Sequence, residues 1–155
     1  MKRFLLMMAG IIFAWGAGAA EIKPLRASDV EPMLAASQGK PQIVEIWSLD
    51  CSYCRENTAR IVEWQKRHRD VRLTMIAMDP IDDNAAALTQ VLASMPLPPQ
   101  TALYANAEAI PDKLRRALDP AWRGEMPRTL LIDARGARQA SSGLLQPAAL
   151  DAWHR

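Results

Sequence analysis

The chain contains two cysteines, Cys51 and Cys54, separated only by Ser52 and Tyr53. A C-x-x-C pair can exchange electrons as a dithiol and a disulfide, supply two soft metal ligands, or form an inert cross-link. A disulfide that closes so short a loop stabilises a fold little, so reactivity explains the pair better than cross-linking does. The pattern alone therefore indicates a redox or metal site.

A structural zinc site would need two further ligands beside the cysteines. The only histidines, His68 and His154, lie far apart in the sequence and lack the spacing of a zinc finger. A peroxidase site is not indicated either, because no isolated cysteine precedes the pair. These counts favour dithiol exchange over the other sulfur chemistries.

The elements around the cysteines must position them. Residues 43–47 form a compact apolar run with one acid, which predicts a buried strand. Residues 55–68 lack Gly and Pro and predict a helix, and residues 71–78 predict a second strand. Such a strand–helix–strand unit is expected to be parallel and right-handed. The cysteines then fall where a strand gives way to a helix.

That placement gives the two sulfurs different roles. Unpaired N–H groups and the positive end of the helix dipole stabilise a thiolate at Cys51. We expect Cys51 to attack a substrate disulfide, or to present its own, through a mixed disulfide. Cys54, one turn further on and more buried, is expected to resolve that intermediate.

The rest of the chain alternates similar elements. Ser28 and Glu31 have the spacing of a capping box and predict a short helix to about residue 36. Further helices are predicted over residues 83–95, 108–118 and from 147 to the end, and extended segments over residues 100–104, 129–132 and 137–142, with a hairpin turn at 133–136. Ile110, Leu114 and Leu118 should line the apolar face of the second of these helices. The predicted class is α/β, with helices on both faces of a mixed sheet.

The first twenty residues have the pattern of a secretory signal peptide. A basic head, Lys2 and Arg3, precedes a short apolar run and a small-residue stretch with cleavage expected after Ala19 or Ala20. The apolar run is short for a membrane span, so a retained anchor is the weaker reading. The remaining chain, 21–155, has the length of one domain and carries 17 basic and 17 acidic residues. That balance gives no electrostatic reason to expect nucleic-acid binding.

Two segments resemble a known family. The run from Val44 to Arg55, V-E-I-W-S-L-D-C-S-Y-C-R, resembles the active-site strand and loop of the thioredoxin superfamily. The run from Gly124 to Gly136, G-E-M-P-R-T-L-L-I-D-A-R-G, is similar to its cis-proline loop and hairpin, most of all to the periplasmic TlpA/ResA-type branch with its P-T-x-x-I-D-x-x-G pattern. Here Arg128 is inserted between the proline and the threonine. The resemblance covers nearly all of 21–155 in element order and implies a thioredoxin-like fold.

The resemblance also implies roles for particular residues. Glu45 matches the buried acid beneath the active site, which would exchange a proton with Cys54; the alternative is a partly exposed acid at a strand end. Pro127 matches the cis-proline, which would set the Met126 backbone beside Cys51 to pair with an extended substrate; a trans Pro127 would be an ordinary strand-edge proline. Trp47 matches a tryptophan of the active-site loop.

The chain departs from the family pattern beside the cysteines. Asp50 replaces the usual tryptophan, and its charge works against a low Cys51 pKa, whereas Arg55 and Arg128 would work for it or be ordinary solvated side chains. The TlpA/ResA-type branch often has an acid three residues after the second cysteine, where this chain has Asn57. No acid is therefore carried over to that position.

The resemblance implies an exported thiol:disulfide oxidoreductase without a cofactor. Ser52-Tyr53 lacks the histidine of the strongly oxidising periplasmic enzyme, and a tyrosine at this position recurs among disulfide isomerases; we place Tyr53, with Trp47, Met126 and Pro127, in the substrate-binding set. We expect a periplasmic reductase acting on client proteins with disulfides or thiols, supplied by a membrane electron-donor thiol protein. A disulfide oxidase or isomerase is the alternative. A copper chaperone using both cysteines is a further one, although the copper carriers of this fold space their cysteines wider and add a histidine that is missing here.

Overall fold

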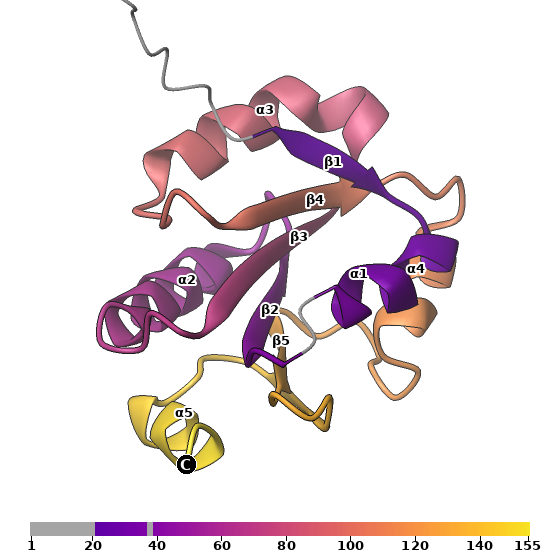
Figure 1. Cartoon of the computed structure of the whole chain (residues 1–155). Helices are drawn as coiled ribbons and strands as arrows, with labels where there is room; N and C mark the ends of the chain where they lie inside the picture. The colour runs from indigo at the N-terminus through magenta and orange to yellow at the C-terminus, as the bar shows by residue number, and fades with distance from the viewer. Residues whose placement is uncertain (1–20, 37–38) are drawn as a thin grey trace, which may run out of the picture.

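The computed structural model describes residues 21–36 and 39–155, and the predicted signal peptide lies outside this part of the chain (Figure 1). Its strands are β1 (Ile22–Leu25), β2 (Gln42–Trp47), β3 (Arg72–Pro80), β4 (Ala102–Asn106), β5 (Arg128–Ile132) and β6 (Arg138–Ser142). Its helices are α1 (Val30–Ala35), preceded by a short 3-10 turn, α2 (Ser52–Gln65), α3 (Ile81–Ser94), α4 (Pro111–Leu118) and α5 (Pro147–Trp153). Within these residues no helix is long and apolar enough to cross a membrane.

The strands form one mixed sheet in the order β1-β4-β3-β2-β5-β6. The first four run parallel, and β5 pairs antiparallel with both β2 and β6. The predicted parallel unit of β2, α2 and β3 is confirmed. Parallel strands end at the same edge of a sheet, so the segments that follow β2, β3 and β4 gather at one edge. The loop that carries Cys51 begins there.

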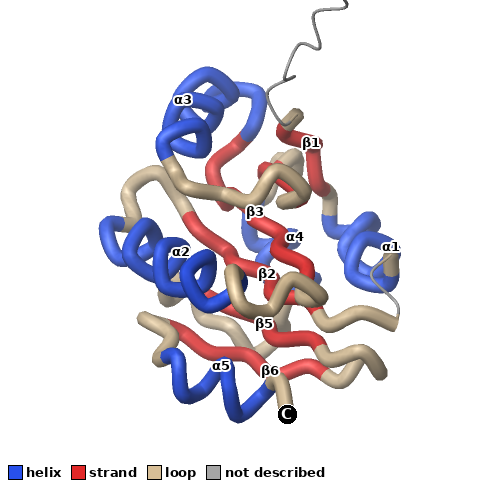
Figure 2. The backbone as a smooth tube through the Cα atoms, turned by 60° about the vertical axis from the view of Figure 1, so that its left-hand side comes forward, coloured by secondary structure: helices blue, strands red, loops and turns tan. Residues whose placement is uncertain are grey.

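Helices cover both faces of the sheet, as the sequence predicted (Figures 1 and 2). On one face α2, α3 and α5 pack through Ile61, Leu88 and Leu150. On the other, α1 and α4 pack through Leu34 and Leu114. Strand β2 is buried along its whole length, because helices cover the sheet on both sides. Since successive side chains of a strand point to opposite faces, β2 contributes side chains to both apolar layers.

Two elements at the start of the chain differ from the prediction. Strand β1 was not predicted, because it has only four residues and one of them is Pro24. It pairs with β4 alone, and such an edge strand tolerates proline. The Ser28–Glu31 capping box does not form. Instead the Asp29 carboxylate accepts the Arg26 backbone N–H at 3.3 Å, and a 3-10 turn leads into α1.

Helix α4 begins later than predicted, and helix α2 begins earlier. Helix α4 begins at Pro111, a residue suited to the first helical position, and Ile110 stands before it with 54% of its surface exposed. The expected core position of Ile110 was therefore wrong, whereas Leu114 and Leu118 are buried as predicted. Helix α2 begins at Ser52, three residues earlier than predicted, which brings Cys54 into its first turn.

The docking of α5 onto α2 yields a prediction about stability. Leu150 is fully buried between these helices. Leu150→Ala should lower the free energy of unfolding by about 2–5 kcal/mol, since it removes buried methyl groups and leaves a cavity. Urea denaturation followed by circular dichroism measures this loss. As a control, Ala148→Ser at an exposed position of α5 should change stability by less than about 0.5 kcal/mol. Equal effects of the two substitutions would contradict this packing.

Candidate active site

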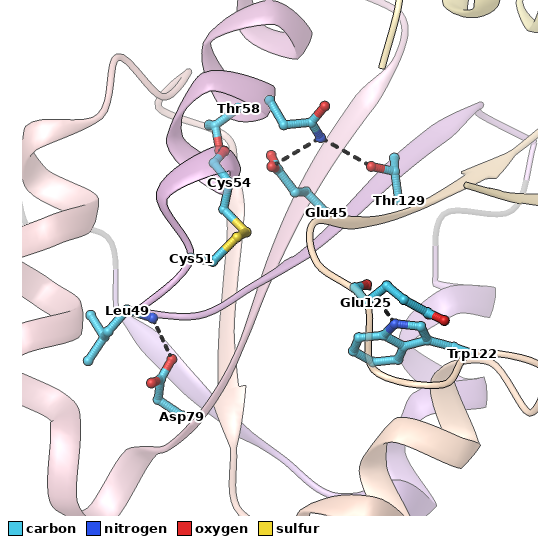
Figure 3. Close-up of a disulfide and its surroundings, with 10 residues drawn as sticks. Glu45, Leu49, Cys51, Cys54, Thr58, Asp79, Trp122, Glu125 and Thr129 are labelled. Atoms are coloured by element: carbon cyan, nitrogen blue, oxygen red, sulfur yellow. Dashed lines mark hydrogen bonds between the residues drawn. A yellow bond between two sulfur atoms is a disulfide. The ribbon is translucent and has the colours of Figure 1, made fainter. Parts of the chain in front are cut away.

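Cys51 and Cys54 lie at the amino-terminal end of α2 and form a disulfide with an S–S distance of 2.03 Å (Figure 3). Cys51 is the N-cap residue with an extended backbone, and Cys54 follows in the first turn. The two differ in exposure: Cys51 is half-buried, while Cys54 has no exposed surface. An incoming thiol or thiolate can therefore reach Cys51 and not Cys54.

The loop between β2 and α2 is fixed at both ends. The Leu49 backbone N–H donates to the Asp79 carboxylate at 3.0 Å, which ties the loop to the end of β3 (Figure 3). The Thr58 hydroxyl donates to the Cys54 carbonyl at 2.9 Å within α2. These contacts hold the first helical turn, where the helix dipole is positive, next to the sulfur of Cys51. Sequence reasoning did not assign a role to either Asp79 or Thr58.

Glu45 is completely buried in the middle of β2, under α2. Burial raises the pKa of Glu45 to about 8, because a charged carboxylate is poorly solvated there; contacts with Thr58 and Asn57 oppose this rise. Oxygen Oε1 accepts a hydrogen bond from Asn57, and Oε2 is buried without a partner in the part of the chain that the structure describes. Glu45 is thus the buried acid that the resemblance implied, and the partly exposed alternative does not apply.

Asn57 is the functional candidate that sequence reasoning left aside. Its side chain has no exposed surface and makes three hydrogen bonds to three separate segments. The Nδ2 group donates to Glu45 Oε1 and to Thr129 Oγ1, each at 3.2 Å, as the dashed lines in Figure 3 mark. Oδ1 accepts the Leu145 N–H at 2.7 Å. Two signals could have indicated it: its place one turn after Cys54 on the same face of the helix, and its match to the position where the TlpA/ResA-type branch often has an acid.

The peptide bond between Met126 and Pro127 is cis, which is the conformation that the resemblance implied. Pro127 directly precedes β5, whose Arg128 lies opposite Ile46 of β2. This antiparallel register brings the Met126–Pro127 segment to the end of β2, the same end from which the cysteine loop starts. Met126 is partly exposed, and no hydrogen bond within the described residues uses its backbone N–H or carbonyl.

The loop before this proline is built around Trp122. Its indole is 1% exposed and packs in the apolar layer under α1 and α4. The indole N–H donates to the Glu125 carbonyl at 2.8 Å (Figure 3), and the Pro127 carbonyl accepts the Gly143 N–H at 2.8 Å. Between them Gly124 has a φ of +107°, a conformation that favours glycine. The segment facing the cysteines is thereby held from both sides.

The remaining predicted residues fall into different environments. Tyr53 is 62% exposed beside the disulfide, where a partner can touch it. Trp47 is 1% exposed and packs in the core, so in this structure it offers almost no surface to a substrate. Asp50 and Arg55 are exposed.

Arg128 does not face the cysteines as a free charge. It forms an ion pair with Asp119 and also donates to the Ser142 hydroxyl at 2.9 Å. Burial works to raise the pKa of Asp119, but the hydrogen bonds from Arg128 and from the Ala121 backbone outweigh it and lower that pKa. The pair joins the end of α4 to the β5–β6 hairpin. Arg128 therefore has a structural role in this fold, and we no longer expect it to support a Cys51 thiolate.

The two histidines come together although they are distant in the sequence. The rings of His68 and His154 lie 4.7 Å apart between centroids, and His68 stacks on Trp64 at 3.9 Å. His154 contacts Asp70 at 3.0 Å, so this cluster joins the ends of α2 and α5. Within residues 21–36 and 39–155, no three His, Cys, Asp or Glu side chains are grouped to hold a metal ion.

Comparison with solved structures identifies the architecture. The chain superposes on a Chlorobium tepidum protein described as a thiol:disulfide interchange protein DsbE with a TM-score of 0.60 and 18% identity, over 77% of this chain and 81% of the other. The chain has the thioredoxin-like fold. A thioredoxin-family thiol:disulfide interchange protein from the same organism gives a TM-score of 0.54 at 23% identity, over 77% and 80% of the two chains.

A secreted disulfide oxidoreductase of Mycobacterium tuberculosis gives a TM-score of 0.52 at 14% identity, over 77% of this chain and 83% of the other. No protein-family model and no curated protein matches the sequence. At these identities the likeness establishes the thioredoxin-like fold, with the C-x-x-C pair of this chain at the junction of β2 and α2.

The burial of Glu45 makes the stability of the disulfide form depend on pH. Its pKa is about 8 in the folded chain against an ordinary value of 4.5, so between these values the folded protein holds a proton that the unfolded chain releases. The contribution of Glu45 is therefore full below about pH 4.5, declines as the pH rises, and levels off above about 8. The decline should approach at most about 1.4 kcal/mol per pH unit.

Urea denaturation at a series of pH values tests this dependence. The Glu45→Gln variant cannot ionise at this position, so the unfolding free energy of the wild type should fall relative to that of the variant from pH 5 to 8. Glu63→Gln, at an exposed position of α2, serves as the control and should leave the wild-type slope unchanged. Parallel pH curves for wild type and Glu45→Gln would show that Glu45 titrates normally.

Proposed function

We propose that this chain is an exported thiol:disulfide oxidoreductase that reduces disulfides in client proteins. The observation that carries the proposal is the asymmetric Cys51–Cys54 disulfide at the start of α2, with one sulfur half-buried and the other fully buried. An exchange centre needs one sulfur that a partner can reach and a second that only the first can reach. The thioredoxin-like fold and the neighbouring Met126–Pro127 segment support this reading.

The reaction transfers two electrons from the dithiol to the client. The Cys51 thiolate attacks one sulfur of the client disulfide, the client S–S bond breaks, and a client thiolate leaves. Cys51 and the client are then joined by a mixed disulfide. Cys54 loses its proton and attacks the Cys51 sulfur, which releases the second client thiolate and forms the Cys51–Cys54 disulfide. The two client thiolates take up protons, so the client is reduced and this chain is oxidised.

The proton of Cys54 must leave within a buried environment. Glu45 is the acid–base group available beneath α2, and burial raises its pKa to about 8, close to the ordinary pKa of a thiol. An ionised Glu45 would take the proton as Cys54 attacks, and a protonated Glu45 would return it when the disulfide is reduced again. A carboxyl group whose pKa lies in the range of thiols can take up and return such a proton at a small cost in free energy.

The client would be held by its backbone. The N–H and carbonyl of Met126 can pair with an extended client segment next to Cys51, in the manner of strand addition. Tyr53 supplies an exposed aromatic surface beside the reacting sulfur. We assign these two residues and Pro127 to client binding, whereas the burial of Trp47 favours a role in supporting the loop.

We propose the reducing direction and a periplasmic location. The Ser52-Tyr53 pair supplies no histidine to stabilise the Cys51 thiolate, which disfavours a strong oxidant. Residues 1–20 would direct export, and a membrane thiol protein would return electrons to Cys51. A disulfide oxidase or isomerase is the second candidate, favoured by the exposed Tyr53, and copper binding by both sulfurs is a third.

Substitution of the cysteines tests the mechanism. Cys51→Ser should lower the rate of insulin disulfide reduction to that of the uncatalysed reaction, because no accessible nucleophile remains. Cys54→Ser should accumulate a mixed disulfide with the client, visible by non-reducing electrophoresis and reversed by dithiothreitol. Ser52→Ala, an exposed neighbour, should retain activity. Full activity of Cys51→Ser would exclude this mechanism.

The redox potential tests the direction of electron flow. Equilibration of the Cys51/Cys54 couple with glutathione buffers should give a value nearer that of thioredoxin, about −270 mV, than that of the strong periplasmic oxidant, about −120 mV. Mass spectrometry after alkylation counts the free thiols at each ratio. A potential at the oxidising end would reject the reductase in favour of the oxidase. Tyr53→His should shift the potential toward oxidising values by stabilising the Cys51 thiolate.

A further inference from the structure

Asn57 sits where three segments meet under the active-site helix. Its amide contacts Glu45 on β2, Thr129 on β5 and Leu145 in the segment before α5. We propose that Asn57 is a positioning residue for the Cys54 step: by engaging Glu45 Oε1, it assigns the exchangeable proton to Oε2. The inference rests on the oxidoreductase function proposed above and adds a residue to it.

The orientation of the Asn57 amide is fixed by a backbone group. The Leu145 N–H can only donate, so the oxygen of the amide must face it, at 2.7 Å. The NH2 group then faces the opposite side, where its two protons meet Glu45 Oε1 and Thr129 Oγ1 at 3.2 Å each. A flipped amide would set two donors against each other at Leu145. The donor aimed at Glu45 is therefore built into the fold.

This donor makes the two oxygens of Glu45 inequivalent. In a neutral carboxyl group the carbonyl oxygen is the better acceptor, so the hydrogen bond from Asn57 favours Oε1 as the carbonyl and Oε2 as the hydroxyl. Oε2 is buried and has no partner among the described residues. The oxygen that bears the proton is thus the one left free to exchange it.

The surroundings of Glu45 leave one titratable neighbour for that exchange. Across the sheet it lies beside Met75 of β3 and Thr129 of β5, neither of which ionises in this pH range. From α2, Glu45 faces Cys54 and Thr58 (Figure 3) and accepts a hydrogen bond from Asn57. No neighbouring charge contributes to the shift of its pKa. Cys54, one helical turn before Asn57, is the group with which a proton can be exchanged.

The test compares two buried amides of α2. Asn57→Ala removes one of the two contacts, with Thr58 and with Asn57, that stabilise the ionised Glu45, so the Glu45 midpoint should rise by roughly one pH unit while the Thr58 contact remains. Gln65→Ala removes the other buried amide, whose bond to the Val71 carbonyl is 2.6 Å long, without touching Glu45. Both variants should lose stability, but only Asn57→Ala should move the midpoint. The midpoint is read in the disulfide form by carbon-13 NMR of selectively labelled glutamate carboxyl groups, assigned with Glu45→Gln.

A kinetic readout links the midpoint to the reaction. In single-turnover reduction of a disulfide peptide, the pH profile of mixed-disulfide resolution should shift upward in Asn57→Ala and stay unchanged in Gln65→Ala. In the Glu45→Gln background, Asn57→Ala should no longer shift it. If Asn57→Ala does not fold, Asn57→Asp keeps the acceptor for Leu145, removes both donors, and should raise the Glu45 midpoint further.

The outcomes separate the inference from the function on which it rests. If Glu45→Gln changes the resolution profile while Asn57→Ala behaves like Gln65→Ala, the role of Asn57 is wrong and that of Glu45 stands. If the Glu45 midpoint is the same in wild type, Asn57→Ala and Asn57→Asp, the role of Asn57 is also wrong. Only retention of activity by Cys51→Ser would remove the oxidoreductase function itself.

Discussion

The burial of one carboxyl group constrains the whole centre of this molecule. Glu45 lies in the middle of a strand that is buried on both faces, where a side chain of its length would ordinarily be apolar. Such a group is tolerated when it is neutral or hydrogen-bonded, and here it is both: its pKa is raised by burial, and Asn57 donates to one oxygen. The cost in stability supports the acid–base role proposed for Glu45, since a leucine would pack there without that cost.

The same constraint explains why three segments converge under α2. Asn57 must be buried to donate a hydrogen bond to the Glu45 carboxyl group. A buried amide in turn needs hydrogen-bond partners for its own oxygen and for its second N–H proton. Those partners come from β5 and from the segment before α5. Thr129 stands two residues after Pro127, so the hydrogen-bond network under the helix is continuous with the segment that faces Cys51. The proposed proton exchange and the proposed client binding would thus share one support.

The sequence allowed us to predict those parts of the site that depend on neighbouring residues in the chain. The junction at Cys51 could be predicted because an apolar run followed by a segment without Gly or Pro marks a strand and then a helix. The position of Pro127 came from the family resemblance. Strand β1 could not be predicted, since four residues including a proline carry no periodic signal and gain stability only from pairing with β4. Ile110 was misplaced because Pro111, and not the apolar spacing, decides where α4 begins.

The role of Asn57 was beyond prediction for a different reason. Three of its hydrogen bonds join residues 12, 72 and 88 positions away in the sequence, and no spacing rule links such positions. The contact between His68 and His154 and the ion pair between Arg128 and Asp119 likewise depend on the tertiary structure, and no spacing rule predicts them. Of these residues, only Arg128 was expected to support the chemistry of Cys51, whereas Asn57 and the two histidines had been assigned no role. Structural polar residues and candidate reactive residues differ in whether their polar atoms all have partners. The charge of Arg128 is neutralised by Asp119, whereas Glu45 keeps one buried oxygen without a hydrogen-bond partner among the described residues. A buried polar group without a partner is a candidate for reactivity.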